Sequence, residues 1–341
     1  MSESPDRQTA WSRYWRQDVL HSLPGSFAGN YAGGIGDFWG RQFGTLGVQQ
    51  RVLDIGTGNG ALPELICRTC DGAMPRVDAI DLADISPEWI QSEPFANRQS
   101  VQFHAGVSAE ALPFPAQSFD LVVSQYGFEY CPAAQAVPEL DRVLKPGGST
   151  ALLLHHRDSR LAQVAREELR LAQWLLQPSG FLDGFEAMLP YLAQASSVAG
   201  RERLRNNATA NAIRDEFNGA MQTASVESNA SPFPDLLLEA RTFVAQGLEA
   251  LGGGASMDGL LESCHQYRQS LRDARLRYAE LCQCAMDADA MTSFADLLAR
   301  HDFVSITYAA IAHDNGMLMG WTLTASKPGG QAAVEGRLPS V

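Results

Sequence analysis

The segment that most limits the fold of this chain is an apolar run leading into a glycine-rich turn, Val52-Leu-Asp-Ile-Gly-Thr-Gly-Asn-Gly60. The apolar run predicts a short buried strand, and residues 61–70 have the pattern of a helix. The glycines of the turn carry no Cβ, so a ligand can approach the backbone closely. A strand, a glycine-rich turn and a helix in this order predict a binding site at the turn.

Strand and helix patterns continue to alternate after this turn. Further strands are predicted at residues 76–81, 101–104, 119–124 and 149–155. Such alternation predicts a parallel sheet with helices on both faces. Two last strands are predicted at residues 302–312 and 317–326, and the Asn-Gly turn between them is typical of an antiparallel hairpin. The expected fold class is therefore α/β, with an antiparallel last strand.

Between the fifth strand and the last helix the alternation stops, and residues 157–289 carry mainly helical patterns. We expect a helical cap over the active site here, although residues 201–231 are polar and weakly patterned. The clearest helix, residues 258–287, has an apolar heptad seam. This helix either packs inside its own chain or pairs with a second copy in a homodimer.

The N-terminal segment, residues 1–47, is rich in aromatic residues and glycine. It predicts a short amphipathic helix followed by a flexible aromatic loop. Tyr31, Phe38 and Trp39 either fold over a ligand as a lid or fasten the segment to the core. We expect the chain to comprise an N-terminal segment (residues 1–47), a core (48–156 and 290–327), a helical cap (157–289) and a flexible tail (328–341).

Charge and cysteine content narrow the function. The chain has 26 basic and 39 acidic residues, a formal net charge of −13, which disfavours binding to nucleic acid and to anionic membranes. The sequence shows neither a secretory signal nor a run of 18 apolar residues, so we expect a cytoplasmic protein. The six cysteines are expected to be reduced thiols, and no metal site is expected.

The glycines alone also satisfy a dinucleotide-binding pattern, but Asp54 at the strand end and the final hairpin argue against it. Several ordered motifs accompany the turn: Ala79-Ile-Asp81, Glu110-Ala-Leu-Pro-Phe-Pro115, Ser118-Phe-Asp-Leu-Val-Val-Ser124, Arg142-Val-Leu-Lys-Pro-Gly-Gly148 and Gly320-Trp-Thr-Leu-Thr-Ala-Ser-Lys-Pro328. With them the sequence resembles the class I S-adenosylmethionine-dependent methyltransferases. The resemblance is to the small-molecule branch that includes quinone and natural-product enzymes. It implies a Rossmann-like, doubly wound sheet of seven strands and S-adenosylmethionine as cofactor.

The resemblance also implies a cofactor site. Residues of the glycine turn would surround the amino-acid half of the cofactor, assisted by the strand-end acid: Asp54, Gly56, Thr57, Gly58 and Asn59. Asp81, with Leu82 beside it, would accept the ribose hydroxyls, and Asp84 is the alternative ribose acid. Ser108 and Ala109 would hold adenine, with serine where family members often carry aspartate. Gln125 would lie at the methionine end.

Because the sulfonium methyl group is already activated, catalysis mainly requires alignment of a nucleophile and exclusion of water. Residues that follow the fourth and fifth strands could supply a general base: Tyr126, Glu129, His155 and His156. If the strand continues, the two histidines point to opposite faces.

The chain lacks both the Asn-Pro-Pro-Tyr motif of amine methylases and the Pro-Cys motif of cytosine methylases. We therefore expect a small apolar or aromatic acceptor, methylated on oxygen, nitrogen or carbon. The alternatives are a protein methyltransferase, a non-catalytic cofactor-binding partner and, more remotely, a nicotinamide enzyme.

Overall fold

The computed structural model describes residues 5–17, 19–21, 29–70, 74–91 and 98–329. The chain divides into two compact units. Unit 1 comprises Met1–Ala162 and Gln283–Val341, and unit 2 comprises Gln163–Cys282. The predicted tail at residues 328–341 lies outside the described residues from position 330 onward.

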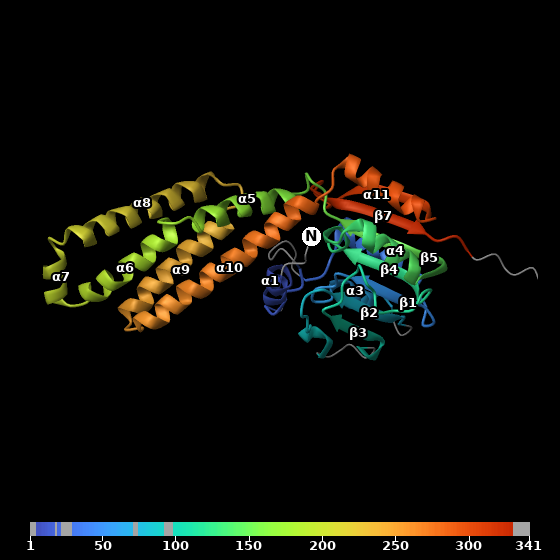
Figure 1. Ribbon diagram of the computed structural model, residues 1–341, viewed down its shortest axis with the longest axis horizontal. Coiled ribbons are helices and arrows are strands. Elements are labelled where there is room, and N and C mark those ends of the chain that lie inside the picture. The colour runs from blue at the N-terminus through green and yellow to red at the C-terminus, as the bar shows by residue number, and fades with distance from the viewer. Residues whose placement is uncertain (1–4, 18, 22–28, 71–73, 92–97, 330–341) are drawn as a thin grey trace, which may run out of the picture. The chain divides into compact units, whose positions relative to one another are not determined.

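Unit 1 is built on a seven-stranded sheet (Figure 1). Its strands are β1 (Arg51–Ile55), β2 (Arg76–Asp81), β3 (Val101–Ala105), β4 (Phe119–Gln125), β5 (Leu144–Leu154), β6 (Val304–Ala312) and β7 (Leu318–Ser326). The order across the sheet is β3-β2-β1-β4-β5-β7-β6. Strands β1 to β5 pair in parallel, whereas β7 runs antiparallel to both β5 and β6. The predicted fold class is confirmed. The strand order reverses between β1 and β4, and ligands of such sheets bind beside the carboxyl ends of the strands there.

One face of the sheet is buried against helices α4 (Ala133–Val143) and α11 (Ala288–Arg300). Leu140 and Phe294 of these helices join Phe119, Val122 and Leu152 of the strands in a single apolar cluster. Helices α2 (Gly33–Phe43) and α3 (Ala61–Thr69) contact each other and contribute no residue to that cluster. Short 3-10 helices complete the unit: η1 (Glu88–Gln91), η2 (Arg98–Ser100) and η3 (Phe128–Tyr130).

The N-terminal segment differs from the prediction. Helix α1 (Pro5–Trp15) is present, but the predicted flexible aromatic loop is wrong, because Gly33–Phe43 forms α2. The helix buries a stripe at helical spacing: Ile35, Phe38, Trp39 and Phe43. The glycines in the first turn of this helix are closely packed. A Cβ at Gly34, for example, would lie 2.7 Å from the Ala312 carbonyl oxygen of β6.

Unit 2 is helical. The helices assigned to it are α5 (Arg160–Leu175, which begins in unit 1), α6 (Phe181–Ala195), α7 (Val198–Leu204), α8 (Ala208–Ala230), α9 (Asp235–Gly252) and α10 (Met257–Cys284). The weakly patterned residues 201–231 are therefore mostly helical, and Asn207 caps α8 through a hydrogen bond from the Ala210 amide. Residues of the heptad seam on α10, Leu260 and Leu271, lie in the core of this unit.

No helix among the described residues is both long enough and apolar enough to cross a membrane.

Candidate active site

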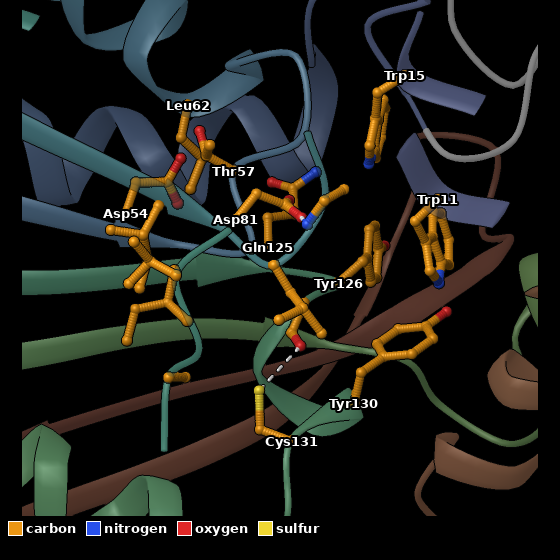
Figure 2. Close-up of a pocket in the computed structure, with 18 of the residues that line it drawn as sticks. Trp11, Trp15, Asp54, Thr57, Leu62, Asp81, Gln125, Tyr126, Tyr130 and Cys131 are labelled. Carbon is orange, nitrogen blue, oxygen red and sulfur yellow. Dashed lines mark hydrogen bonds between the residues drawn. The ribbon is translucent and has the colours of Figure 1, made fainter. Parts of the chain in front are cut away.

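A pocket in unit 1 opens at the carboxyl ends of β1, β2 and β4 and is bordered by α1 (Figure 2). Its described lining residues fall into three groups. The strand ends, with the turns and helix starts that follow them, contribute Asp54, Ile55, Gly56, Thr57, Ala61, Leu62, Ile80, Asp81, Leu82, Ala83, Gln125, Tyr126, Gly127, Tyr130 and Cys131. The loop after β3 contributes Val107, Ser108, Ala109 and Glu110. The N-terminal part contributes Arg7, Gln8, Trp11, Trp15, Leu20, His21 and Tyr31.

The glycine turn is held against the neighbouring strand ends. The Gly56 and Thr57 amides donate to the Ile80 carbonyl at 2.9 and 3.0 Å. Gly56 has φ of 69°, and a Cβ there would lie 3.0 Å from the Gly127 Cα. Only glycine satisfies both the backbone conformation and this close approach. The turn is therefore packed closely against the backbone that follows β4.

Of the two candidate ribose acids, Asp81 lines the pocket and Asp84 does not. The Asp81 carboxylate accepts hydrogen bonds from the Gly58 and Ala83 amides, each at 2.8 Å. Burial raises the pKa of Asp81, and the two amides oppose this shift. Asp84 instead forms an exposed ion pair with Arg16 at 3.1 Å. Asp81 therefore keeps further lone pairs available inside the pocket.

Asp54 is almost completely buried at the end of β1, with 1% of its surface exposed. Neither carboxylate oxygen has a hydrogen-bond partner among the described residues. Burial raises the pKa of Asp54 to about 7, an effect only partly opposed by the nearby Thr57 hydroxyl. A buried carboxylate without a partner is costly, so this position suits a cationic or hydrogen-bond-donating ligand group.

The loop after β3 borders the pocket next to Asp81. The Val107 amide donates to the Asp81 carbonyl at 2.9 Å, which joins this loop to the end of β2. Ser108 and Ala109 both line the pocket, and the Ser108 hydroxyl oxygen accepts a hydrogen bond from the Glu110 amide at 3.2 Å. Their assignment to the adenine ring stays a prediction from the resemblance.

Gln125 and Tyr126 form the turn after β4. Gln125 accepts a hydrogen bond from the Trp39 indole, and its amide nitrogen has no partner in the described part of the chain. Tyr126 has φ of 53°, a conformation that is uncommon for a bulky residue and recurs at functional sites. Its hydroxyl donates to the Met319 carbonyl at 3.1 Å, so the strained turn is supported by β7.

Two of the proposed catalytic residues form a layer behind Tyr126. The His155 ring stacks on the Tyr126 ring with centroids 4.4 Å apart, and the His155 amide donates to the Glu129 carboxylate at 2.6 Å. Burial lowers the pKa of His155 to about 3 and raises the pKa of Glu129 to about 7. Neither side chain is a lining residue, so of the four candidates only Tyr126 borders the pocket.

His156 is outside the pocket. Its ring stacks on Trp321 with centroids 4.6 Å apart, and its Nδ1 accepts a hydrogen bond from the Asp158 amide at 2.9 Å. The predicted opposite orientation of the two histidines is consistent with these contacts, but neither histidine reaches the pocket in this structure.

Several other predicted residues also do not line the pocket. Phe38 and Trp39 are buried in the face of α2 rather than folded over the ligand site, and only Tyr31 of that trio is a lining residue. Gly58 contributes its amide to Asp81. Asn59 turns its side chain to the N-terminal segment, where it donates to the Trp15 and Val19 carbonyls.

Sequence reasoning missed the aromatic end of the pocket. Trp11 and Trp15 of α1 stack on each other with centroids 5.9 Å apart, and Trp11 meets Tyr130 edge to face at 5.8 Å. Figure 2 shows these rings with Tyr126 at the end opposite Asp54 and Thr57. The Arg7 side chain also connects α1 to this end of the pocket, because it donates a hydrogen bond to the Tyr130 carbonyl at 3.1 Å. The available signal was the four-residue spacing of the two tryptophans, which places both on one helix face.

The site fits S-adenosylmethionine. The unpartnered Asp54 carboxylate matches an ammonium group, and the free lone pairs of Asp81 match a pair of hydroxyls. Gly56 and Thr57 of the glycine turn line the same pocket.

Comparisons with known proteins find methyltransferases among the relatives of this chain. Residues 52–148 match the family model described as a methyltransferase domain. An uncharacterized methyltransferase of Mycobacterium tuberculosis is 35% identical over 116 residues, which cover 34% of this chain and 44% of the relative's length. A malonyl-[acyl-carrier protein] O-methyltransferase of Enterobacter lignolyticus is 31% identical over 221 residues, covering 64% of this chain and 73% of the relative.

Solved structures with similarity include a putative S-adenosyl-L-methionine-dependent methyltransferase of Methanococcus maripaludis. It is 16% identical and has a TM-score of 0.40. The match covers 88% of this chain and 86% of the Methanococcus chain. Another is the phosphoethanolamine N-methyltransferase 2 of Haemonchus contortus in complex with S-adenosyl-L-methionine, at 15% identity and a TM-score of 0.37. That match covers 96% of this chain and 58% of the Haemonchus chain.

Proposed function

We propose that this chain, which belongs to the class I S-adenosylmethionine-dependent methyltransferases, transfers a methyl group to a small, flat, apolar or aromatic molecule. The observation that carries the proposal is the two-ended pocket. One end has the acids Asp54 and Asp81 with the glycine turn, suited to the cofactor, and the other is walled by Trp11, Tyr126 and Tyr130. The Trp15 ring packs on Gly58 and on Trp11, between the two ends.

The cofactor end would work through a few contacts of this chain. Asp81 would accept the ribose hydroxyls, Asp54 would face the ammonium group, and the Gln125 amide nitrogen would donate to the carboxylate. When bound, the cofactor supplies an activated methyl group on a sulfonium. The tryptophans and tyrosines would orient the acceptor and exclude water, which lowers the barrier by alignment.

Proton removal from the acceptor does not require His155 or Glu129 to touch it. Burial raises the pKa of the Tyr126 hydroxyl well above its usual value and keeps His155 neutral at physiological pH. These residues would therefore support the shape of the acceptor wall rather than carry charge. Acceptors that ionise easily, such as phenols, or that carry a neutral amine suit such a site best.

A second acceptor class, a carboxylate on an acyl chain, is favoured by a specific pair of observations. The relative from Enterobacter lignolyticus is named for methylating a malonyl group on a carrier protein. In this chain Arg7 lies among the residues at the aromatic end and is the one arginine or lysine among the described lining residues. A guanidinium suits recognition of a carboxylate.

Transfer of labelled methyl from S-adenosylmethionine to a panel of phenols, aromatic amines and acyl carboxylates tests the proposal. We expect label in organic-soluble products that survive mild alkali, because methyl ethers and methylamines resist it whereas methyl esters are hydrolysed. Alkali-labile product would favour the carboxylate class. Label recovered only in lysate proteins would contradict the small-molecule proposal, and absence of transfer to any fraction would favour a non-catalytic cofactor-binding partner.

A Trp11→Ala variant tests whether the aromatic wall binds the acceptor. It should raise the acceptor KM at least about tenfold, because a large face packed on the acceptor is removed. The affinity for S-adenosylhomocysteine should change less than the acceptor KM. Equal losses for both ligands would contradict the assignment of Trp11 to the acceptor end.

A further inference from the structure

The Asn59 side chain does not face the pocket, although Asn59 belongs to the glycine turn. It is 3% exposed, and its amide nitrogen donates two hydrogen bonds of 2.8 Å, one to the Trp15 carbonyl and one to the Val19 carbonyl. The Asn59 carbonyl in turn accepts from the Trp89 indole at 2.7 Å, so the residue is held from both sides.

The Trp15 carbonyl belongs to the last turn of α1. The final carbonyls of a helix have no partner within the helix and must be satisfied from outside. Asn59 satisfies one of them with a side chain from the glycine turn, and thereby caps α1 at its C-terminal end. A hydrogen-bond donor is required for this contact, because both partners are carbonyl oxygens.

The same contact aligns α1 with the turn. The Trp15 ring lies over Gly58, where a Cβ would approach the ring to 2.6 Å. The Gly58 amide donates to Asp81, the residue proposed to hold the ribose. The chain of contacts therefore runs from Asp81 through Gly58 and Asn59 to α1, which carries Trp11 and Trp15 to the aromatic end of the pocket.

We propose that Asn59 is a positioning residue that couples occupancy of the cofactor end to the docking of α1, and so to the acceptor wall. This inference rests on the proposed function. Binding at Asp81 and the glycine turn would fix the turn, Asn59 would hold α1 on it, and the two tryptophans would then stand where the acceptor packs. Coupling of this kind is reciprocal: the factor by which the ligand stabilises docked α1 equals the factor by which docked α1 strengthens ligand binding.

Hydrogen exchange of the α1 amides, measured with and without S-adenosylhomocysteine, tests this coupling. The informative variant is Asn59→Asp, which keeps the shape of the side chain but replaces its donors by acceptors. Ser12→Ala is the matched control, because the Ser12 hydroxyl also holds α1, accepting from the Asp84 amide at 2.9 Å, but does not touch the glycine turn. Asn59→Ala is the second variant if the aspartate variant does not fold.

In the wild-type chain we expect S-adenosylhomocysteine to slow α1 exchange at least about tenfold. In Asn59→Asp the α1 amides should exchange faster without ligand and should gain no protection on ligand binding. In the same variant, the Kd for S-adenosylhomocysteine should rise by the factor by which the ligand slows α1 exchange in the wild-type chain. In Ser12→Ala the ligand-free exchange should also be faster, but protection by the ligand should persist.

Unchanged α1 exchange in Asn59→Asp, or full protection by the ligand in that variant, would overturn the proposal. Loss of ligand protection in Ser12→Ala to the same extent would also overturn it, since any loosening of α1 would then suffice. If the wild-type chain bound no S-adenosylhomocysteine, the proposed function and the coupling would both fail. The ligand-free exchange would still decide separately whether Asn59 holds α1.

Discussion

At the scale of single residues, burial decides the behaviour of the acidic groups near the pocket. Asp54 and Glu129 have few or no charged partners, and desolvation raises the pKa of each to about 7. Asp54 and Asp81 were predicted as cofactor residues from the resemblance to the methyltransferase family, on the motifs at the ends of the first two strands. Sequence reasoning could not assign Asn59, whose partners are backbone carbonyls about 40 positions away in the sequence.

Glu129 makes one contribution to the pH dependence of stability, alongside Asp54, whose pKa is also raised to about 7. The pKa of Glu129 rises from an ordinary value near 4.5 to about 7, so between these pH values the folded protein holds a proton that the unfolded chain has lost. The stability contributed by this proton is present below about pH 4.5 and is lost as the pH rises through 7. Burial lowers the pKa of His155 from 6.5 to about 3, so between these pH values the unfolded chain holds a proton that the folded protein lacks. This shift makes the folded protein more stable as the pH rises, which is opposite to the effect of Glu129. The pH dependence of wild-type stability therefore combines both effects.

A Glu129→Gln variant isolates the contribution of Glu129, because glutamine still accepts the His155 amide hydrogen bond. We expect the variant to match the wild type at pH 5 and to be more stable at pH 8 by on the order of 2–3 kcal/mol, from the conversion of pKa shift to free energy. Urea unfolding at the two pH values measures this difference. A variant that is less stable than the wild type at pH 8 would show that the ionised carboxylate is stabilised by something other than the described contacts.

At the scale of elements, the strands were predicted from the sequence, and so was helix α1, but helix α2 was not. Strand positions follow from apolar runs bounded by turns, and the Asn-Gly turn predicted the antiparallel pair of β6 and β7. Glycines near the start of α2 suggested a loop, because helix propensity counts against glycine. Tertiary packing outweighed this propensity, because the absence of a Cβ at Gly34 allows α2 to approach β6.

The role of α2 in shaping the site can be tested with Trp39→Phe. Trp39 is fully buried, stacks on Phe43 with centroids 5.3 Å apart, and holds the Gln125 side chain by a hydrogen bond. Phenylalanine keeps much of the packing but loses this bond, which should reduce the free energy of unfolding by about 1–3 kcal/mol. Gln125 would lose its fixed orientation, so S-adenosylhomocysteine affinity should fall by about threefold to tenfold. Thermal unfolding and calorimetry measure the two effects, and unchanged affinity would show that α2 does not position Gln125.

At the scale of the whole molecule, each of the two units has its own core. Unit 2 packs Phe181 and Phe185 with Leu237 and Leu271, while the strands of unit 1 pack on α4 and α11. The sequence predicted a helical segment because strand alternation ends after residue 156. It could not show that polar residues 201–231 form helices, because those helices are stabilised by packing more than by a strong pattern.

The seam of α10 contributes to the core of unit 2, so its apolar residues already have partners within the chain. A cap over the active site and a homodimer through this segment both remain predictions.

Because each unit has its own core, we expect that a destabilising substitution in unit 2 does not change cofactor binding. Phe181→Ala removes a fully buried ring from the centre of unit 2 and should destabilise that unit by about 3–5 kcal/mol. Hydrogen exchange should accelerate in α6 and α8, whereas the amides of β1 and β4 and the Kd for S-adenosylhomocysteine should change by less than about threefold. A parallel loss of ligand affinity would contradict the independence of the two cores.

The central claim, that the glycine turn and Asp81 form a cofactor site, is tested most directly by titration calorimetry with S-adenosylhomocysteine. The comparison is between the wild type, Asp81→Ala and Asp84→Ala. Hydrogen bonds to a charged group contribute about 1.5–3 kcal/mol each, so Asp81→Ala should weaken binding at least about tenfold. Asp84→Ala should bind within about twofold of the wild type, because the exposed Asp84 is not a lining residue. Binding that survives in Asp81→Ala, or a wild-type chain that does not bind the ligand, would contradict the account.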